Sequence, residues 1–368
     1  MKFTCNKDII LKEIAIAQEI ISSRNSISIL SNILLEADGN TLTLRATDLK
    51  VGFESKIPVD TSQSGSTTVY CDKFLSVVRS LPDGDIEFSC LDDNRLLITP
   101  LFSKIDFTLK SITADKYPEL QNISDDTYFN IPQKEFIEMI NQTVFAVSDD
   151  ETRYYMNGVY LEHENNILSM VATDGRRLSF IKTESNAEGI IFDPVIIPTK
   201  ILQLIRKLST GEGNLSLAVN ENNIFVKFNN QKLFSNLIKG QFPNYKRVIP
   251  EVQEYTVQVQ RKLLMEALKR VSLLVEQKSR RIFITFIENT IILSSEESEI
   301  GIAKEEVSCS FTGPETTIAL NYLYLVEPLR VIEDDTIIIK FSEANKAITL
   351  VPSVEKDYFH IVMPMQLD

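Results

Sequence analysis

The sequence has few of the residues on which metal, disulfide or redox chemistry depends. It contains two histidines and four cysteines, and the cysteines stand far apart with no C-x-x-C pattern and no neighbouring histidine. Such spacing is typical of reduced thiols in a cytosolic protein and argues against a disulfide framework or a zinc site. We therefore expect no bound metal and no cofactor.

Catalytic motifs are also missing. The chain has no motif of an activated nucleophile, no P-loop and no dinucleotide-binding loop. His163 and His360 stand in unrelated contexts and are interpreted as incidental. The acidic pairs at 149–150 and 334–335 lie in polar loop contexts, where solvated turns are expected rather than metal ligands. These absences indicate a binding or scaffolding protein rather than an enzyme.

Long apolar segments are absent as well. No stretch reaches the roughly 18 uninterrupted apolar residues that a membrane span needs, and the first residues include no apolar signal region. The net charge of −13 and the pI near 4.9 argue against a generally basic nucleic-acid binder, although local patches are not excluded. We expect a cytoplasmic protein that makes no membrane contact.

The dominant feature that is present is a repeat. Phe3, Phe129 and Tyr255 each open a short alternating strand followed by an amphipathic helix, and the three positions are 126 residues apart. A chain of 368 residues is long for one hydrophobic core. The repeat predicts three domains, at residues 1–126, 127–252 and 253–368.

Each predicted domain contains a second, weaker repetition. Strands at 67–70, 195–197 and 317–320 precede further helices, and short alternating runs split by turn residues follow the helices. Runs of strands joined by tight turns predict antiparallel sheets. The predicted fold class is α+β, with two β-α-β-β-β halves in each domain. Pro328 should kink the last helix or restart it after Glu327.

One hairpin occurs twice at the same spacing. Thr47-Asp48 ends the first copy and Thr173-Asp174 ends the second, but only the second continues as Gly-Arg-Arg-Leu at 175–178. Because both copies carry Thr-Asp, we expect that pair to serve the shared fold. The residues that are specific to the second copy are expected to serve function.

Charge is divided unevenly between the predicted helices and the remaining chain. We predict six helices, at residues 7–24, 72–80, 133–148, 199–208, 261–281 and 320–332. They carry 17 Lys or Arg against 9 Asp or Glu, a net charge of +8. Because the whole chain has a net charge of −13, the rest of the chain must carry −21. One interpretation is ordinary solvated helix faces, since Lys and Arg favour helices. The other is a shared positive surface that attracts phosphates without reading bases.

Several motifs together resemble one protein family. The chain opens with Met-Lys-Phe-Thr and has Val-Met-Pro-Met near its end. Between them lie Arg-Tyr-Tyr-x-Asn-Gly at 153–158, Ala-Thr-Asp-Gly-x-Arg-Leu at 172–178 and Phe-Pro-x-Tyr-x-Arg-Val at 242–248. These motifs extend over the whole chain and resemble the beta subunit of bacterial DNA polymerase III, the sliding clamp family.

The resemblance implies a ring-forming homodimer of two three-domain subunits, with helices lining a central hole and antiparallel sheets outside. Such a ring encircles double-stranded DNA, slides along it without sequence preference and tethers the replicative polymerase, so its hold is topological rather than catalytic. The alternative hypothesis is a docking scaffold of the same fold that never encircles DNA. An enzyme acting on DNA through its loop carboxylates is a third hypothesis.

The resemblance also implies a pocket for short linear motifs of the replicative polymerase, the clamp loader and repair polymerases. Flexible methionines and a few fixed polar groups suit a pocket that binds many peptides in turn. The pocket residues implied are Arg153, Tyr155, Met156, Thr173, Gly175, Arg176, Arg177, Leu178, Pro243, Arg247, Val248, Asn321, Tyr324, Ala347, Ile361, Met363, Pro364 and Met365.

Two further sets of residues follow from the same resemblance. The DNA-facing candidates are Arg24, Lys73, Tyr154, Tyr155 and Lys200, and Asp72 and Asp150 stand where a relative has basic or amide residues. Ring closure would join Phe107 and Leu109 of one subunit to Leu273 and Leu274 of the other, in a head-to-tail contact.

Overall fold

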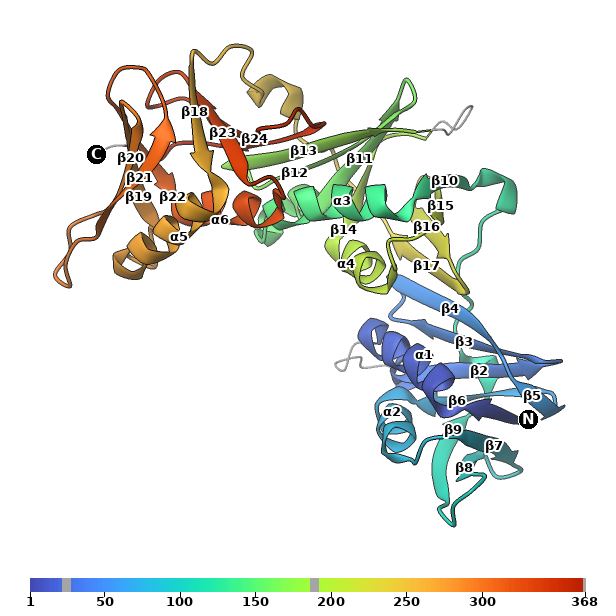
Figure 1. The fold of residues 1–368 in the computed structure, drawn as a ribbon. Coiled ribbons are helices and arrows are strands. Elements are labelled where there is room, and N and C mark those ends of the chain that lie inside the picture. Colours follow the sequence, from blue (N-terminus) through green and yellow to red (C-terminus); the bar gives the residue numbers. More distant parts are fainter. Residues whose placement is uncertain (22–27, 186–191, 367–368) are drawn as a thin grey trace. The chain divides into compact units, whose positions relative to one another are not determined.

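The computed structural model describes residues 1–21, 28–185 and 192–366 (Figure 1). The chain forms two compact units. Unit 1 consists of Met1–Pro132 and Glu212–Leu237, and unit 2 consists of Gln133–Gly211 and Ile238–Asp368. Unit 1 contains a 13-stranded sheet and unit 2 a 12-stranded sheet, and every pair of described strands is antiparallel. The predicted α+β class is confirmed, and the domain limits at 126 and 252 stay predictions.

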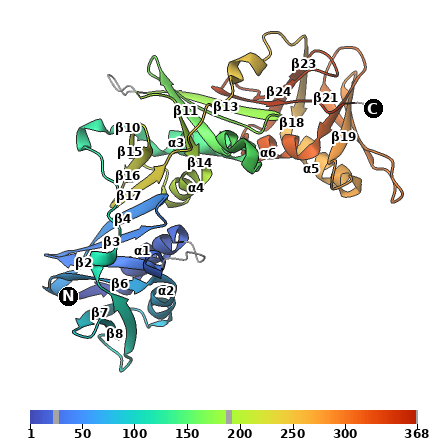
Figure 2. The same cartoon turned by 180° about the vertical axis from the view of Figure 1, so that it is seen from behind.

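The six β-α-β-β-β halves predicted from the repeat are all present, in order along the chain (Figure 2). The first two halves are β1 (Lys2–Asn6), α1 (Lys7–Ile20), β2 (Asn32–Asp38), β3 (Thr41–Thr47) and β4 (Val51–Pro58), then, after the extra strand β5 (Asp60–Gln63), β6 (Gly65–Tyr70), α2 (Cys71–Ser80), β7 (Asp85–Leu91), β8 (Arg95–Pro100) and β9 (Phe107–Ile112). The third and fourth are β10 (Phe129–Pro132), α3 (Gln133–Thr143), β11 (Gly158–Glu164), β12 (Ile167–Thr173) and β13 (Arg177–Glu184), then β14 (Val195–Pro198), α4 (Thr199–Leu208), β15 (Asn214–Val219), β16 (Asn223–Phe228) and β17 (Gln231–Asn236). The last two are β18 (Tyr255–Gln260), α5 (Arg261–Val271), β19 (Arg281–Ile287), β20 (Thr290–Ser295) and β21 (Lys304–Ser310), then β22 (Thr316–Asn321), α6 (Tyr322–Val331), β23 (Thr336–Phe341), β24 (Ile348–Pro352) and β25 (Tyr358–Val362).

Helix α1 shows why the strand-helix pattern folds as predicted. Asn6 ends β1 and caps the helix, because its side chain accepts a hydrogen bond from the Asp8 backbone N–H. Ile10, Ile14 and Ala17 recur at helical spacing, are completely buried and face β3 and β4. In unit 2, α3 packs in the same way against β12 and β13 (Figure 1).

Two helices end earlier than the sequence pattern indicates. Helix α5 stops at Val271 rather than at residue 281, and a short 3-10 helix, Ser272–Leu274, follows it. Residues 276–281 contain no apolar side chain, so a longer helix would have no apolar stripe to bury. Helix α3 likewise ends at Thr143 instead of residue 148. The predicted end of α1, at residues 22–24, lies outside the described residues.

Pro328 does not restart the last helix, so that part of the prediction was wrong, while the kink stays a prediction. Helix α6 continues through Pro328 to Val331, and the Pro328 carbonyl accepts a hydrogen bond from the Ile332 backbone N–H. Leu325 and Leu329 on either side of the proline are buried. This packing outweighs the single helix hydrogen bond that a proline cannot donate.

Strand pairing in unit 1 repeats the pairing in unit 2, with one difference in packing. Strand β4 pairs with β17 as β13 pairs with β25, and Gly52 stands 126 residues before Leu178. A Cβ atom on Gly52 would lie 1.9 Å from Cε1 of Phe234 on the neighbouring strand. The Phe234 ring therefore fills in unit 1 the space that the Leu178 side chain takes in unit 2.

Replacing Gly52 with alanine is expected to destabilise unit 1 by about 1–3 kcal/mol, because the Phe234 ring must leave its packed position. Urea denaturation of the variant would measure the loss. The double variant with Gly52→Ala and Phe234→Leu should lose less free energy of unfolding than the two single variants lose together, since the smaller side chain relieves the clash. A Gly52→Ala protein that unfolds at the same urea concentration as the parent would contradict this packing.

Candidate functional site

The Thr-Asp pair closes the same turn in both copies of the hairpin. The Thr173 hydroxyl donates to the Arg177 carbonyl at 2.6 Å, and Asp174 Oδ1 accepts from the backbone N–H groups of Arg176 and Arg177. Thr47 and Asp48 make the corresponding bonds: the Thr47 hydroxyl donates to the Val51 carbonyl at 2.8 Å, and Asp48 Oδ1 accepts from the backbone N–H groups of Lys50 and Val51. The pair therefore serves the fold, as predicted.

The third residue of this turn distinguishes the copies. It has a positive φ in both, 73° at Leu49 and 86° at Gly175. A Cβ atom on Gly175 would lie 3.0 Å from Nη1 of Arg153, so the glycine lets that guanidinium approach the turn. Arg153 is held there by Asp150, whose Oδ2 accepts from Nε at 2.9 Å. Asp150, which stands where a relative has a basic or amide residue, thus has a structural role: it positions Arg153.

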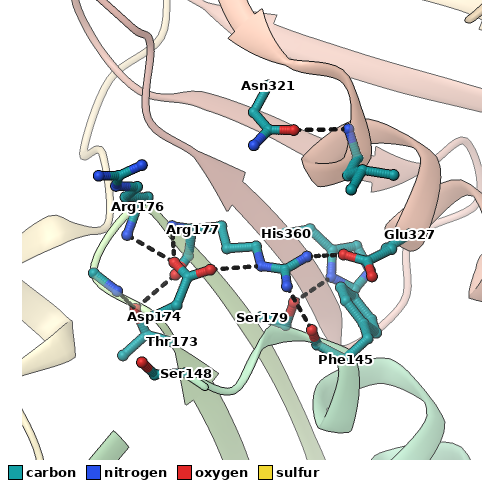
Figure 3. A network of polar contacts seen from close by, with 12 residues as sticks. Phe145, Ser148, Thr173, Asp174, Arg176, Arg177, Ser179, Asn321, Glu327 and His360 are labelled. Atoms are coloured by element: carbon teal, nitrogen blue, oxygen red, sulfur yellow. Dashed lines mark hydrogen bonds and ion pairs between the residues drawn. The ribbon is translucent and has the colours of Figure 1, made fainter. Parts of the chain in front are cut away.

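Arg177 is the centre of a polar network behind the turn (Figure 3). Its Nε donates to Asp174 Oδ2 at 3.0 Å, and its Nη2 donates to the Phe145 carbonyl at 2.6 Å. Its Nη1 forms an ion pair with Glu327 of α6, and the guanidinium lies 4.6 Å from the centre of the Tyr324 ring. Only 10% of the Arg177 side chain is exposed. One arginine therefore ties the turn to α6 and to the segment after α3.

His360 belongs to the same region and is completely buried (Figure 3). Its Nδ1 lies 3.0 Å from the Ser179 hydroxyl, and its Nε2 lies 3.2 Å from the side-chain oxygen of Gln142 on α3. Gln142 in turn donates to the Val331 carbonyl at the end of α6. Burial lowers the pKa of His360 from 6.5 to about 3, so the imidazole is neutral and structural rather than catalytic.

Acid is expected to destabilise unit 2 through His360. Below pH 6.5 the unfolded chain binds a proton that the folded chain does not bind until about pH 3, so stability falls as the pH falls through this window. At pH 4.5 the loss amounts to about 3 kcal/mol. The difference in urea midpoint between pH 7 and pH 4.5 should therefore shrink in His360→Gln and persist in the control His163→Gln. An equal pH dependence in both variants would contradict the assignment.

A cleft opens beside the turn, with a volume of about 170 Å³. It is lined by Met156, Thr173, Gly175, Arg177, Leu178, Pro243, Asn244, Tyr245, Val248, Ile361 and Met363. Nine of these residues belong to the predicted partner pocket. Asn244 and Tyr245 were not predicted, although both lie inside the Phe-Pro-x-Tyr-x-Arg-Val motif at 242–248, which is the signal that could have identified them.

The C-terminal segment forms one side of the cleft. The Met363 backbone N–H donates to the Arg176 carbonyl at 2.8 Å, and the Met365 N–H donates to the Ala319 carbonyl at 2.8 Å. These bonds leave the Met363 side chain 40% exposed at the cleft. Pro364 and Met365 are half-buried in the same segment.

The remaining predicted pocket residues surround the cleft without lining it. Arg176 and Arg247 are exposed, while Tyr155 and Ala347 pack in the apolar cluster behind Leu178. Asn321 caps α6 by accepting from the Leu323 N–H at 3.0 Å (Figure 3). Tyr324 packs under the Arg177 guanidinium.

The DNA-facing candidates lie in both units. Arg24 is outside the described residues. Lys73 is exposed on α2, with its Nζ 3.6 Å from Asp72. Tyr154 is 53% exposed and makes an edge contact with Tyr155, and Lys200 is half-buried in the first turn of α4. Their contact with DNA stays a prediction.

The dimer candidates lie next to strand edges that are only partly paired. Phe107 and Leu109 are on β9, which pairs with β8 over residues 107–110 but with β6 only at Ser111 and Ile112. Leu273 is 79% exposed, and Leu274 lies 3.8 Å from the Cβ position of Gly301, just before β21. Strand β21 pairs with β18 only at Cys309 and Ser310. Among the described strands, β9 and β21 thus each have part of one edge open.

The described residues offer neither a metal site nor a membrane-spanning helix. No group of three His, Cys, Asp or Glu side chains in this part of the chain is arranged to hold a metal ion. No helix among the described residues is long and apolar enough to cross a membrane.

Comparison with known proteins identifies the family. Models of the N-terminal, central and C-terminal domains of the DNA polymerase III beta subunit match residues 1–121, 130–244 and 246–366. The chain is 46% identical over 372 residues to the beta sliding clamp of Treponema pallidum and 31% identical over 381 residues to that of Halalkalibacterium halodurans, with all of each chain covered.

Solved structures agree with these matches. The sliding clamp of Bacillus subtilis aligns over 100% of both chains with a TM-score of 0.95 at 27% identity. A sliding clamp of Pseudomonas aeruginosa bound to griselimycin aligns over the same share with a TM-score of 0.95 at 29% identity. The chain therefore belongs to the family of the DNA polymerase III beta subunit, the beta sliding clamps, and is a DNA sliding clamp and processivity factor.

Proposed function

We propose that two subunits form a closed ring around double-stranded DNA in the cytoplasm, and that each holds replication and repair proteins by a short peptide in its cleft. The hold on DNA is topological, and the clamp catalyses no reaction. The observation that carries this proposal is the charge of the exposed helix surfaces, taken together with the family assignment.

The six described helices expose ten basic side chains and three acidic ones, whereas the whole chain has a net charge of −13. The exposed basic residues are Lys12, Lys73, Arg79, Lys134, Arg206, Lys207, Lys262, Lys269, Arg270 and Arg330. Lysine and arginine on helix surfaces attract phosphates without selecting a sequence, which is what a sliding contact requires. The negative charge of the remaining chain would repel DNA from other surfaces.

The partly open edges of β9 and β21 support the proposed subunit contact. An open edge presents backbone N–H and C=O groups that another strand can pair with. Before and on β9 the exposed charges are Lys104, Asp106 and Lys110, a net positive charge, whereas before and on β21 the exposed anions Glu297, Glu299 and Glu306 outnumber Lys304. Pairing β9 of one subunit with β21 of the next would combine backbone hydrogen bonds, apolar contact and opposite charge.

The cleft has the features of a site for apolar peptide side chains. Its walls include the buried Leu178 and Ile361, the half-exposed Val248 and Met363, whose unbranched side chain can adopt several conformations. Arg177 and Thr173 supply fixed polar groups at one side. Such a mixture suits several partners that bind one at a time.

Retention on DNA of defined topology tests the ring. The clamp is loaded by its clamp loader onto nicked circular plasmid, isolated by gel filtration and then treated with a restriction enzyme that cuts once. We expect retention on the circle and rapid loss from the linear product, because a ring slides off free ends. Equal retention on both would contradict the proposal.

A matched pair of variants makes the test specific. Leu273→Asp should yield subunits of about 41.8 kDa in light scattering, half the mass of the parent dimer, and should abolish retention. Val354→Asp introduces the same charge at another exposed apolar residue of unit 2 and should leave both mass and retention unchanged. A parent protein that is monomeric yet binds polymerase peptides would instead favour a docking scaffold.

A further inference from the structure

A second groove lies directly beside the cleft in unit 2, with a volume of about 280 Å³. It is lined by Glu162, Glu164, Asn165, Ile167, Ser169, Phe180, Lys182, Tyr245, Lys246 and Ile249. Tyr245 lines both the cleft and this groove, so one side chain separates them. None of the groove residues other than Tyr245 lines the cleft.

Two chain segments form walls of both the cleft and the groove. On β13, Leu178 lines the cleft, and Phe180 and Lys182 line the groove. Because side chains two residues apart on a strand share a face, these three form one row. The second wall is the 3-10 helix Tyr245–Val248, from which Val248 faces the cleft, while Lys246 and the following Ile249 face the groove.

The partition between the two spaces is fixed in position. The Tyr245 hydroxyl donates a hydrogen bond to Glu162, whose side chain is only 14% exposed. Burial, with the neighbouring Glu162 carboxylate, raises the pKa of Tyr245, so the hydroxyl remains a donor at neutral pH. The Tyr245 ring also packs near Tyr160 and Phe180.

The chemistry of the groove favours an apolar side chain. Phe180, Ile167 and Ile249 give it apolar walls. The two lysines at its rim already have anionic partners: Lys182 lies 3.3 Å from Asp357, and Lys246 lies 3.8 Å from both Glu162 and Glu164. An incoming anion would have to compete with these carboxylates, whereas an apolar side chain would not.

We propose that this groove binds an apolar side chain of the same partner peptide whose neighbouring residues occupy the cleft. The proposal rests on the proposed function, since it extends the peptide site. The row from Leu178 to Lys182 spans about 13 Å at about 3.3 Å per residue, so an extended peptide covers it with about four residues. The groove therefore selects partners that carry a leucine- or phenylalanine-sized residue about four positions beyond the residue bound at Leu178.

Two peptides distinguish the groove from the cleft. The short probe is the shortest segment of the replicative polymerase that the immobilised clamp retains. Two long probes each add four residues ending in phenylalanine, one at the N-terminus and one at the C-terminus of that segment. Fluorescence anisotropy should show one long probe binding roughly tenfold more tightly than the short one, the gain expected for burying one large apolar side chain.

Variants on each side of Tyr245 assign the gain. Ile167→Asn should remove the advantage of the long probe and leave the short probe unchanged, whereas Val354→Asn should alter neither. Leu178→Lys should weaken both probes at least tenfold. If Ile167→Asn leaves the long-probe advantage intact, or if neither long probe gains affinity, the groove proposal fails while the cleft stands. If Leu178→Lys changes neither probe, the cleft itself is refuted.

A photoreactive probe gives a readout that does not depend on affinity. A benzophenone in place of the added phenylalanine should label residues 162–169, 180–182 or 245–249 in the full dimer. Labelling confined to other segments would overturn the proposal even if the long probe bound more tightly.

Discussion

Arg177→Ala is expected to lower the free energy of unfolding of unit 2 by about 3–5 kcal/mol. The reason is that Arg177 neutralises Asp174 and Glu327 in a largely buried position, and its removal leaves both carboxylates without their cation. The Phe145 carbonyl also loses its donor, and the Tyr324 ring loses the guanidinium that packs on it. Urea denaturation followed by circular dichroism would measure the change.

The neighbouring arginine provides a matched control. Arg176 is exposed, and only its backbone groups take part in the turn, so Arg176→Ala should change stability by no more than about 0.5 kcal/mol. Equal effects of the two alanine substitutions would refute the structural role given to Arg177. The double variant with Arg177→Ala and Glu327→Gln should lose less free energy of unfolding than the two single variants lose together, because the second change removes one uncompensated charge.

Deletion of residues 363–368 is expected to weaken binding of polymerase-derived peptides at least a hundredfold while the subunits still form a dimer. Met363 supplies one apolar wall of the cleft, and its N–H bond to Arg176 holds the segment beside the turn. The dimer should persist because Phe107, Leu109, Leu273 and Leu274 lie in other segments. Isothermal titration of the peptide and light scattering of the protein would measure the two properties.

A shorter deletion controls for the loss of the chain end itself. Removing only residues 366–368 keeps Met363 and the Met365 N–H bond to Ala319, so peptide affinity should stay within about twofold. Met363→Ala in the full chain should weaken binding by an intermediate amount, since it shortens one wall only. Unchanged affinity after the longer deletion would refute the assignment of the cleft.

The sequence was sufficient for the repeated architecture because the repeat is a property of local patterns. Alternation in the strands and helical spacing of residues such as Ile10 and Ile14 determine which faces are buried, and they recur at a constant interval. The Thr-Asp pairs could be assigned to the fold because the first hairpin has such a pair without the Gly-Arg-Arg-Leu that follows it in the second. Helix ends were less predictable. The predicted helix at 261–281 ends at Val271 because residues 276–281 have no apolar side chains to pack against the sheet.

Contacts between distant segments could not be predicted from the pattern. Arg177 was predicted as a pocket residue, and it lines the cleft. Its second role, supporting the turn through Glu327, could not be predicted because 150 residues separate the two in sequence. His360 was interpreted as incidental because nothing near it in the sequence indicates a role. Its contacts with Ser179 and Gln142 join segments that are far apart in the chain. Tyr245 was missed because its role comes from dividing two spaces, which only the folded chain brings together.

If the cleft docks partner peptides as proposed, the position of Phe234 against Gly52 bears on how many of them one ring can hold. The hairpin occurs twice in each chain, but in unit 1 the Phe234 ring takes the space that the Leu178 side chain takes beside the cleft in unit 2. The cleft described in unit 2 is therefore present twice in a dimer. Partners with one motif must compete for these two clefts, whereas a partner with two motifs on a linker of suitable length gains from its high effective concentration at the second cleft. The exchange of polymerases on DNA would then depend on how many motifs each carries as well as on the affinity of any one of them.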